Sequence, residues 1–578
     1  MQNIPTSSGN APSQDQSQPH IRPANDVHPL GTWSGDEANI NDALSLTDAL
    51  MQVNKPVYLC RDNNACFRVH TSGHGVFGEF MSNNSDSASA LQQVLGYAAP
   101  LPPQACGNAA FLSAHRMRYP VIAGSMAKGI SSAAMVKAMG EAGMLGFLGS
   151  AGLEVREVES QLLQLQDDLN PAGHAYGANL IHSPNEPELE QKLVDMYVRI
   201  GLNLIEASAF LKITPPLVEY RLHGIHQDDN GNIVTPNRII AKVSREEIAT
   251  HFLSPPPQKI VAHLQAQGKI SAEQVRLAQH IPMADDITAE ADSGGHTDNR
   301  PAMALFPTIV ALRDTLQQQY QYPEPPRVGL GGGIATPYAA AGAFAMGAAY
   351  IVTGSVNQAC VEAGTCAAVK QMLAEAQQAD IAMAPAADMF EMGVNVQVLK
   401  RGTMFSMRAA SLYELYRKHA SIEDIPAAER TKLEKNIFKA GLDEVWENTR
   451  AFFARRDPRE IERAEKDPKH KMALIFRSYL GQATHWAIEG DPERRIDYQI
   501  WCGPALPAFN AWTKGTFLEQ PRQRRVVDVN LNLLVGAAVW LRATMLGRAR
   551  AWYEQTHPDN ALVLQPLTRE QINACLQA

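Results

Sequence analysis

The chain has 578 residues, of which 45% are hydrophobic, so it is long enough for one large domain with smaller satellites. Its formal net charge is −9 and its basic residues are scattered, which argues against nucleic acid or an anionic membrane surface as a partner. The seven cysteines include no CxxC pair and no Cys/His grouping of zinc spacing, which predicts reduced thiols in the cytoplasm and no metal site.

The N-terminal part lacks the features of a targeting segment. Residues 1–27 are rich in Ser, Gln, Asn and Pro and have almost no large apolar side chains, so we expect a disordered tail rather than a secretory signal. Short mixed segments between residues 28 and 104 predict a small N-terminal α+β region.

A repeating unit fills residues 105–378. Each repeat has a short apolar run, a Gly/Ser/Asn loop and a segment with apolar residues at helical spacing. The predicted strands are Pro120–Met126, Leu145–Gly149, Ala175–Ile181, Leu204–Phe210, Arg238–Ser244, Asp286–Asp292, Arg327–Gly332 and Ala349–Gly354. Eight such units predict an α/β fold of the (β/α)8 TIM barrel type, whose usual size is about 250 residues. An open doubly wound sheet is the alternative, but no G-x-G-x-x-G follows the first strand.

Two regions depart from this alternation. Residues 254–283 begin with a run of prolines and contain a helical hairpin pattern, which predicts an inserted helical lid or subdomain. Residues 379–578 carry long helical patterns and predict a helical C-terminal region. Within it, the apolar stretch Leu533–Leu541 is too short to span a bilayer and is predicted to be a buried helix.

Two glycine-rich loops follow the last two predicted strands. They are Gly331-Gly332-Gly333-Ile334 and Thr353-Gly354-Ser355. Glycines let backbone N–H groups approach phosphate oxygens, and the following helices direct their positive ends at an anion. Phosphate sites recur at this place in barrels, so we predict a phosphate site here rather than simple tight turns.

A histidine follows two glycines at the end of the sixth predicted strand. The segment is Asp292-Ser293-Gly294-Gly295-His296. Active sites of barrels lie at this rim, and glycines before a histidine leave room for a flat ring beside the backbone. Among the chain's histidines, His296 is therefore the candidate catalytic residue.

Polar side chains also occur at the ends of other predicted strands. The first strand runs into the small-residue loop Gly124-Ser125-Met126, where a flat ring system has room to lie against the backbone. Asn179 and Lys242 interrupt otherwise apolar strands. A buried lysine without a partner is costly, so Lys242 is expected to meet an anion or a flavin carbonyl.

Together these residues resemble the nitronate monooxygenase and FabK-type enoyl reductase superfamily of FMN-binding (β/α)8 barrels, over residues 119–376. The Gly-Gly-His segment is the hallmark of that superfamily, and Asp292 stands where its members usually have Glu. The resemblance implies FMN contacts at Gly124, Ser125, Met126, Asn179, Lys242, Gly294, Gly295, Gly332, Gly333, Ile334, Gly354 and Ser355.

One branch of the superfamily is more similar and covers most of the chain: the PfaD-type trans-acting enoyl reductases of polyunsaturated fatty acid and polyketide synthases. The segments that carry this likeness are Ala384–Gly393, Gln397–Phe405 and Gln499–Pro504.

The resemblance implies a reaction and its partners. FMN would take hydride from NADPH or NADH and reduce an enoyl thioester bound to an acyl carrier protein domain, with His296 or a held water as proton donor. Lys400, Arg401 and Arg408 are candidate contacts for the acidic carrier. A homodimer is one option for the assembly. An FMN oxidase of the nitronate monooxygenase kind and a non-catalytic docking subunit are the alternative functions.

Overall fold

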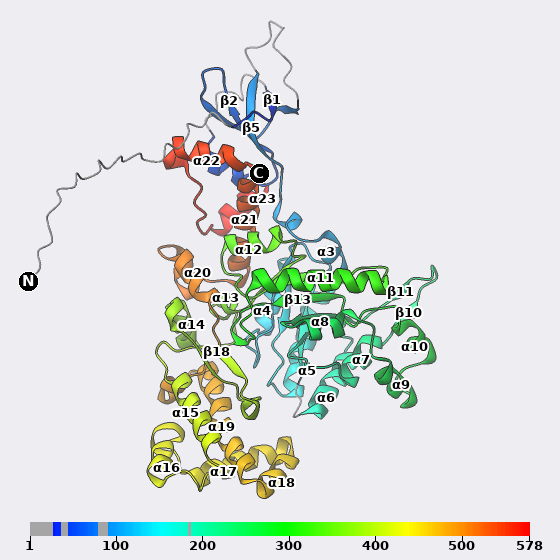
Figure 1. The fold of residues 1–578 in the computed structure, drawn as a ribbon, viewed down its shortest axis with the longest axis vertical. Helices are drawn as coiled ribbons and strands as arrows, with labels where there is room; N and C mark the ends of the chain where they lie inside the picture. The colour runs from blue at the N-terminus through cyan, green and yellow to red at the C-terminus, as the bar shows by residue number, and fades with distance from the viewer. Residues whose placement is uncertain (1–26, 36–43, 79–90, 183–185, 578) are drawn as a thin grey trace, which may run out of the picture. The chain divides into compact units, whose positions relative to one another are not determined.

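The structure is a computed structural model that describes residues 27–35, 44–78, 91–182 and 186–577 (Figure 1). The tail expected at residues 1–27 therefore lies outside the described residues, apart from residue 27. The chain divides into two compact units. One unit comprises Met1–Pro100 and Arg542–Val563, and the other comprises Leu101–Leu541 and Leu564–Ala578. The N-terminal α+β region thus shares its unit with a segment that we expected in the helical C-terminal region.

The first unit is built on a five-stranded sheet with the order β3-β2-β5-β1-β4. Its elements are β1 (Gly31–Ser34), α2 (Leu46–Met51), β2 (Val57–Arg61), β3 (Phe67–His70), β4 (His74–Phe77), β5 (Gln92–Ala98) and α22 (Gly547–Thr556). Trp33 is fully buried and stacks on His70, with 3.8 Å between ring centroids. Arg542 is also fully buried, and its guanidinium donates to the carbonyl oxygens of Leu50, Gln52, Lys55 and Ala99.

The second unit contains a closed parallel barrel with the order β12-β13-β15-β16-β6-β7-β8-β9, which confirms the TIM barrel. Its strands are β6 (Val121–Ala123), β7 (Leu145–Leu148), β8 (Gly177–Ile181), β9 (Leu204–Ser208), β12 (Arg238–Val243), β13 (Asp286–Glu290), β15 (Arg327–Gly331) and β16 (Ile351–Thr353). Each falls within a strand predicted from the sequence. Nearly all their residues are buried, as expected for parallel strands that are covered on both faces.

Helices surround the barrel (Figure 1). They are α3 (Ala109–His115), α4 (Ala133–Glu141), α5 (Val155–Leu169), α6 (Pro187–Arg199), α7 (Pro215–Leu222), α8 (Glu246–Leu253), α11 (Ala302–Tyr320), α12 (Pro337–Ala345), α13 (Ser355–Gln358) and α14 (Ala367–Ala374). Local sequence explains several starts. Ser132 and Thr336 accept hydrogen bonds from the amides of Met135 and Ala339, and so cap α4 and α12.

The insertion at residues 254–283 is helical, with α9 (Gln258–Ala266) and α10 (Ala272–Ala278). It follows α8 and precedes β13, which places it at the amino-terminal end of the strands. There the Gln274 side chain donates to the carbonyl of Leu222, beside the hairpin β10 (His226–Gln227) and β11 (Ile233–Val234) that leads into β12. The insertion therefore does not form the expected lid, because the catalytic rim of a barrel is at the carboxyl ends of the strands.

The C-terminal region contains a small sheet as well as helices. Strands β14 (Gly295–His296), β18 (Asn395–Leu399) and β17 (Ile381–Pro385) form an antiparallel sheet in that order. The helices are α15 (Phe405–Lys418), α16 (Ala427–Leu433), α17 (Leu442–Arg456), α18 (Pro458–Lys466), α19 (Pro468–Glu489), α20 (Ala505–Thr513), α21 (Val526–Met545) and α23 (Arg569–Gln577). We expected helices alone, because this sheet depends on the pairing of β14 with β18, which joins segments far apart in sequence.

Helix α21 contains the apolar stretch Leu533–Leu541. By length and composition alone the helix could cross a membrane, but 78% of its apolar window is buried inside the protein. It thus packs as a core helix, in agreement with the sequence prediction. One helix of this kind is weak evidence for a membrane span.

Buried charges connect two barrel strands at their amino-terminal ends. The carboxylate of Asp286 on β13 lies 2.6 Å from Nε2 of His115 and 2.5 Å from Nε of Arg327 on β15. Burial raises the pKa of Asp286, but His115 and Arg327 outweigh it and hold the pKa below its usual value. The carboxylate thus remains charged inside the protein.

Replacing this carboxylate should destabilise the barrel. Asp286→Asn leaves the buried Arg327 without its counter-charge, so we expect the free energy of unfolding to fall by about 3–5 kcal/mol. Chemical denaturation measures this loss. Asp167→Asn, at an exposed carboxylate, is the matched control and should change stability by less than about 0.5 kcal/mol. Equal unfolding midpoints for the two variants would contradict the structural role of Asp286.

Candidate active site at the carboxyl rim of the barrel

Three charged side chains meet at the carboxyl ends of neighbouring strands. Glu206 comes from β9, Lys242 from β12 and Glu290 from β13. The Lys242 Nζ atom lies 3.8 Å from Oε2 of Glu206 and 3.3 Å from Oε1 of Glu290. Burial lowers the pKa of Lys242, but the two carboxylates outweigh it and raise the pKa, so the lysine is charged. Lys242 was expected to contact an anion, and the anions are the carboxylates of Glu206 and Glu290 in the same chain.

Glu206 is the most deeply buried member of this group, with 1% of its surface exposed. Its Oε2 accepts hydrogen bonds from the backbone amide and the hydroxyl of Ser125. Its Oε1 is buried and has no hydrogen-bond partner in the described part of the chain. Burial is the main cause that raises the pKa of Glu206, against the opposing effects of Lys242 and Ser125. Ser125 is therefore bonded within the site, and one carboxylate oxygen is left unsatisfied.

The strand-one loop is connected to its neighbours. The Gly124 amide donates to the carbonyl of Thr353 at 3.0 Å, and the Met126 amide donates to Oγ of Ser131 at 3.0 Å. Asn179 is buried in the middle of β8, and its Nδ2 donates to the carbonyl of Glu206 at 3.0 Å. The Asn179 side chain thus bonds to the adjacent strand and helps to fix the position of Glu206.

His296 lies in β14, the short strand that follows β13. Its backbone pairs with Val396 of β18, and its Nε2 lies 3.0 Å from Oδ1 of Asp388. The imidazole is half-buried. Burial lowers the pKa of His296, but the hydrogen bond and the charge of Asp388 prevail, and the pKa is raised from its ordinary value. His296 thus binds its proton more tightly than an ordinary histidine does.

Two glycines bring the His296 loop against the C-terminal region. A Cβ on Gly294 would lie 2.8 Å from the amide nitrogen of Gly503 and 2.8 Å from Oγ of Ser355. The Gly503 amide donates to this Ser355 hydroxyl at 3.2 Å. Gly295 has a φ of +79°, which favours glycine. Close packing therefore requires glycine at position 294, and the backbone conformation favours glycine at position 295.

The two predicted phosphate loops leave open space above the backbone. A Cβ on Gly333 or on Gly354 would meet no atom of the described residues within 4 Å. By contrast, Gly332 has a φ of +86° and its Cβ would lie 2.7 Å from the carbonyl group of Ala291, while Ile334 is buried. Gly332 and Ile334 thus shape the loop, and Gly333 and Gly354 border the space.

These observations fit a phosphorylated flavin. Open glycine backbones occur on the two loops where barrels bind phosphate, a charged lysine stands on the same rim, and Glu206 keeps one buried oxygen unsatisfied. Gly333, Gly354, Lys242 and Glu206 are the residues that could hold such a group. Ser355 and Asn179 already bond to the chain, so their contact with FMN stays a prediction.

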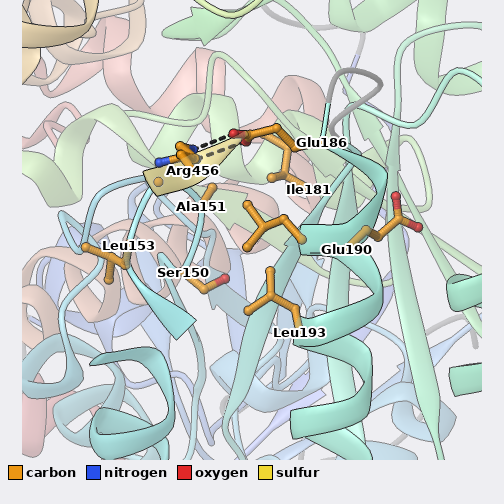
Figure 2. Close-up of a pocket in the computed structure, with 10 residues that line it drawn as sticks. Ser150, Ala151, Leu153, Ile181, Glu186, Glu190, Leu193 and Arg456 are labelled. Carbon is orange, nitrogen blue, oxygen red and sulfur yellow. Dashed lines mark hydrogen bonds and ion pairs between the residues drawn. The ribbon is translucent and has the colours of Figure 1, made fainter. Parts of the chain in front are cut away.

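A small pocket lies beside this rim, between the ends of β7 and β8 (Figure 2). It is lined by Ser150, Ala151, Gly152, Leu153, Ile181, Glu186, Leu189, Glu190, Leu193 and Arg456. Figure 2 shows the ion pair between Arg456 of α17 and Glu186 at the start of α6. Nearby, the Lys128 Nζ atom donates to the carbonyl of Gly481 at 2.9 Å, and burial with the nearby Arg456 lowers the pKa of Lys128 to about 8. Both contacts attach the helical region to the barrel.

Sequence reasoning missed Glu206 and Asp388 as site residues. Glu206 interrupts the apolar run Leu204–Ser208 just as Lys242 interrupts its own strand, so the same signal was present. Asp388 is 92 residues from His296 in sequence. It lies in the segment Ala384–Gly393 that carries the likeness to one branch, but nothing in that segment indicates its contact with His296.

Comparisons with known proteins relate the chain to proteins of polyunsaturated fatty acid and polyketide biosynthesis. The crystal structure of the enoyl reductase domain of MlnA, from the macrolactin biosynthesis cluster of Bacillus amyloliquefaciens, is 40% identical with a TM-score of 0.73, and the match covers 76% of this chain and 98% of that domain. One polyunsaturated fatty acid synthase subunit from Thraustochytrium sp. is 42% identical over 93% of this chain. The polyketide biosynthesis protein PksE of Bacillus subtilis is 43% identical over 82% of this chain.

The chain spans 35% of the length of the Thraustochytrium protein and 61% of PksE. Residues 419–498 match a family model described as the inserted helical domain of [acyl-carrier-protein] S-malonyltransferase. This segment contains α16 to α19.

Removing the charge of Lys242 should leave the carboxylates of Glu206 and Glu290 without the positive charge that lies between them. For Lys242→Met we expect a loss of about 3–5 kcal/mol of unfolding free energy near neutral pH. Without the lysine the pKa of the buried Glu206 rises further, so the carboxyl is neutral at lower pH and the loss should be smaller at about pH 5 than at about pH 8. Denaturant unfolding at both pH values measures it. The exposed Lys432→Met is the control, and a deficit that does not depend on pH would refute this account.

Proposed function

The chain belongs to the family of the enoyl reductase domain of MlnA, and from this premise we propose that it is an FMN-dependent enoyl reductase of the PfaD type. It would act in trans on enoyl thioesters during polyunsaturated fatty acid or polyketide biosynthesis. The observation that carries the proposal is the position of His296. A half-buried imidazole with a raised pKa stands on the same barrel rim as Lys242 and the open glycine loops.

The proposed chemistry divides between the cofactor and the chain. FMN would transfer hydride from NADPH or NADH to the β-carbon of the enoyl thioester. Gly333 and Gly354 would bind its phosphate, and Lys242 would place positive charge beside the ring. His296 would hold a proton and deliver it to the α-carbon. The barrel and the C-terminal region would position these groups and exclude water.

The proposed partner is an acyl carrier protein. One relative is named as a subunit of a polyunsaturated fatty acid synthase and another as a polyketide biosynthesis protein. Carrier-bound chains are the expected substrates of such systems. Of the candidate basic contacts, Lys400 and Arg401 are exposed. Arg408 is instead half-buried and bonded to the buried Asp497, so it holds the helical region together rather than offering a free charge.

An anaerobic visible spectrum tests the reaction. The purified protein should show a flavin spectrum that bleaches with NADPH and returns when a crotonyl thioester is added. If protein incubated with FMN contained no bound flavin, the assignment of FMN as the cofactor would be wrong. Recolouring only with air would favour the oxidase of the nitronate monooxygenase kind.

Replacement of His296 tests its role as proton donor. For His296→Ala we expect enoyl reduction to fall by about 10² or more, because general acid catalysis typically contributes that much. FMN content and the reduction of the flavin by NADPH should stay near wild type. The exposed His280→Ala is the control. Enoyl reduction at the wild-type rate in the His296 variant would show the assignment to be wrong.

A further inference from the structure

We propose that Asp388 is a positioning residue for His296, and that the proton delivered to the substrate leaves from Nδ1 of the imidazole. The inference rests on the proposed function and extends it to a residue outside the barrel. The observation that carries it is the 3.0 Å contact between Nε2 of His296 and Oδ1 of Asp388.

The surrounding structure holds both partners in place. The backbone of His296 pairs with Val396, so one strand of the small sheet carries the imidazole. Asp388 lies in the turn between β17 and β18, which is closed by a 2.9 Å hydrogen bond from the Ala386 amide to the carbonyl of Val394. Arg477 of α19 donates to the carbonyl of Ala387 at 2.9 Å. The next residues of the turn are anchored by Phe390, which is fully buried in the apolar core. The carboxylate is therefore presented by a fixed turn.

The hydrogen bond determines which ring nitrogen is available. A carboxylate only accepts hydrogen bonds, so Nε2 carries the hydrogen that Asp388 binds. Within the described part of the chain, no hydrogen bond is seen at Nδ1. In the imidazolium form Nδ1 also carries a hydrogen, and this is the one free to be transferred. Asp388 thus orients the ring and stabilises the protonated form, as a carboxylate does for a catalytic histidine in general.

The charges around the pair favour the ionised state of both groups. His296 faces Asp388 and Glu290, which raise its pKa, and Lys242, which lowers it along with burial. Burial raises the pKa of Asp388, but the hydrogen bond from His296 and its charge, helped by Arg477, keep the pKa below its usual value. The imidazolium form of His296 and the ionised carboxylate of Asp388 therefore stabilise each other.

The proton step balances with the proposed reduction. The N–H bond at Nδ1 breaks and its electron pair stays on the nitrogen, while a C–H bond forms at the α-carbon of the enoyl thioester. NADPH or NADH supplies the hydride equivalent that reaches the β-carbon. The neutral imidazole then regains its proton from water, and Nε2 keeps its hydrogen bond to Asp388 throughout.

Asp388→Asn tests this role, because the amide has the same shape and no charge. We expect the turnover rate for a crotonyl thioester to fall by about tenfold to a hundredfold. Because His296 acts as an acid, activity is lost as the pH rises through the pKa of His296. Without the Asp388 carboxylate this pKa falls, so the alkaline limb of the rate profile should move to lower pH. The NMR titration of the His296 ring should move in the same direction, which a purely structural role would not produce. Asp424→Asn, at an exposed carboxylate, is the control and should leave both measurements at wild-type values.

The outcomes separate this inference from the proposed function. An Asp388→Asn variant with a wild-type rate profile and a wild-type His296 titration would overturn the positioning role. If the wild-type protein reduces no enoyl thioester, the proposed function fails, and the NMR titration still reports whether Asp388 raises the pKa of His296. Flavin reduction by NADPH should be equal in both proteins; a loss of that step in the variant would mean that Asp388 acts on the cofactor instead, which also contradicts the inference.

Discussion

The pairing of β14 with β18 is the interaction on which the candidate site depends. It is only two residues long, with Gly295 opposite Gln397 and His296 opposite Val396. Yet it joins the rim of the barrel to a region that lies about a hundred residues further along the sequence. Gln397 adds a side-chain hydrogen bond to Asp292 at 3.2 Å. A loop after a barrel strand is ordinarily the mobile part of such a fold. Here backbone pairing on one side and the Gly294–Gly503 packing on the other hold the loop, and with it the imidazole.

Charge is distributed differently at the two ends of the barrel. At the amino-terminal end, Asp286 is enclosed by His115 and Arg327, and its bonds are satisfied within the chain. At the carboxyl end, Lys242 stands between two carboxylates at longer distances, and Oε1 of Glu206 has no partner among the described residues. A satisfied network stabilises a core, whereas an unsatisfied buried oxygen is costly and is typical of places that bind a ligand. This contrast supports the carboxyl rim as the end of the barrel that binds a ligand.

The C-terminal helical region contributes residues that border the carboxyl rim of the barrel. It is attached near β7 and β8 through Arg456 with Glu186 and through Lys128 with Gly481, and near β13 through the small sheet and Asp388. The rim is therefore bordered from two sides by residues that lie beyond the barrel in sequence. The segment expected to cover it, residues 254–283, lies at the opposite end of the strands because it follows α8 rather than a strand. Chain order within a β/α unit decides which end an insertion occupies.

The sequence by itself determined the barrel and much of the rim. Eight apolar runs separated by helical patterns set the strand positions, since strands buried on both faces need continuous apolar residues. His296, Lys242 and the glycine loops were identified for the same local reason, because a polar or glycine residue at the end of an apolar strand stands out. What only the tertiary structure decided is which distant groups meet these residues. The pairing of β14 with β18, the bond from His296 to Asp388 and the sharing of one unit by residues 1–100 and 542–563 all join segments far apart in the chain. Such contacts depend on how the chain folds back on itself, and periodicity within a short window contains no information about them.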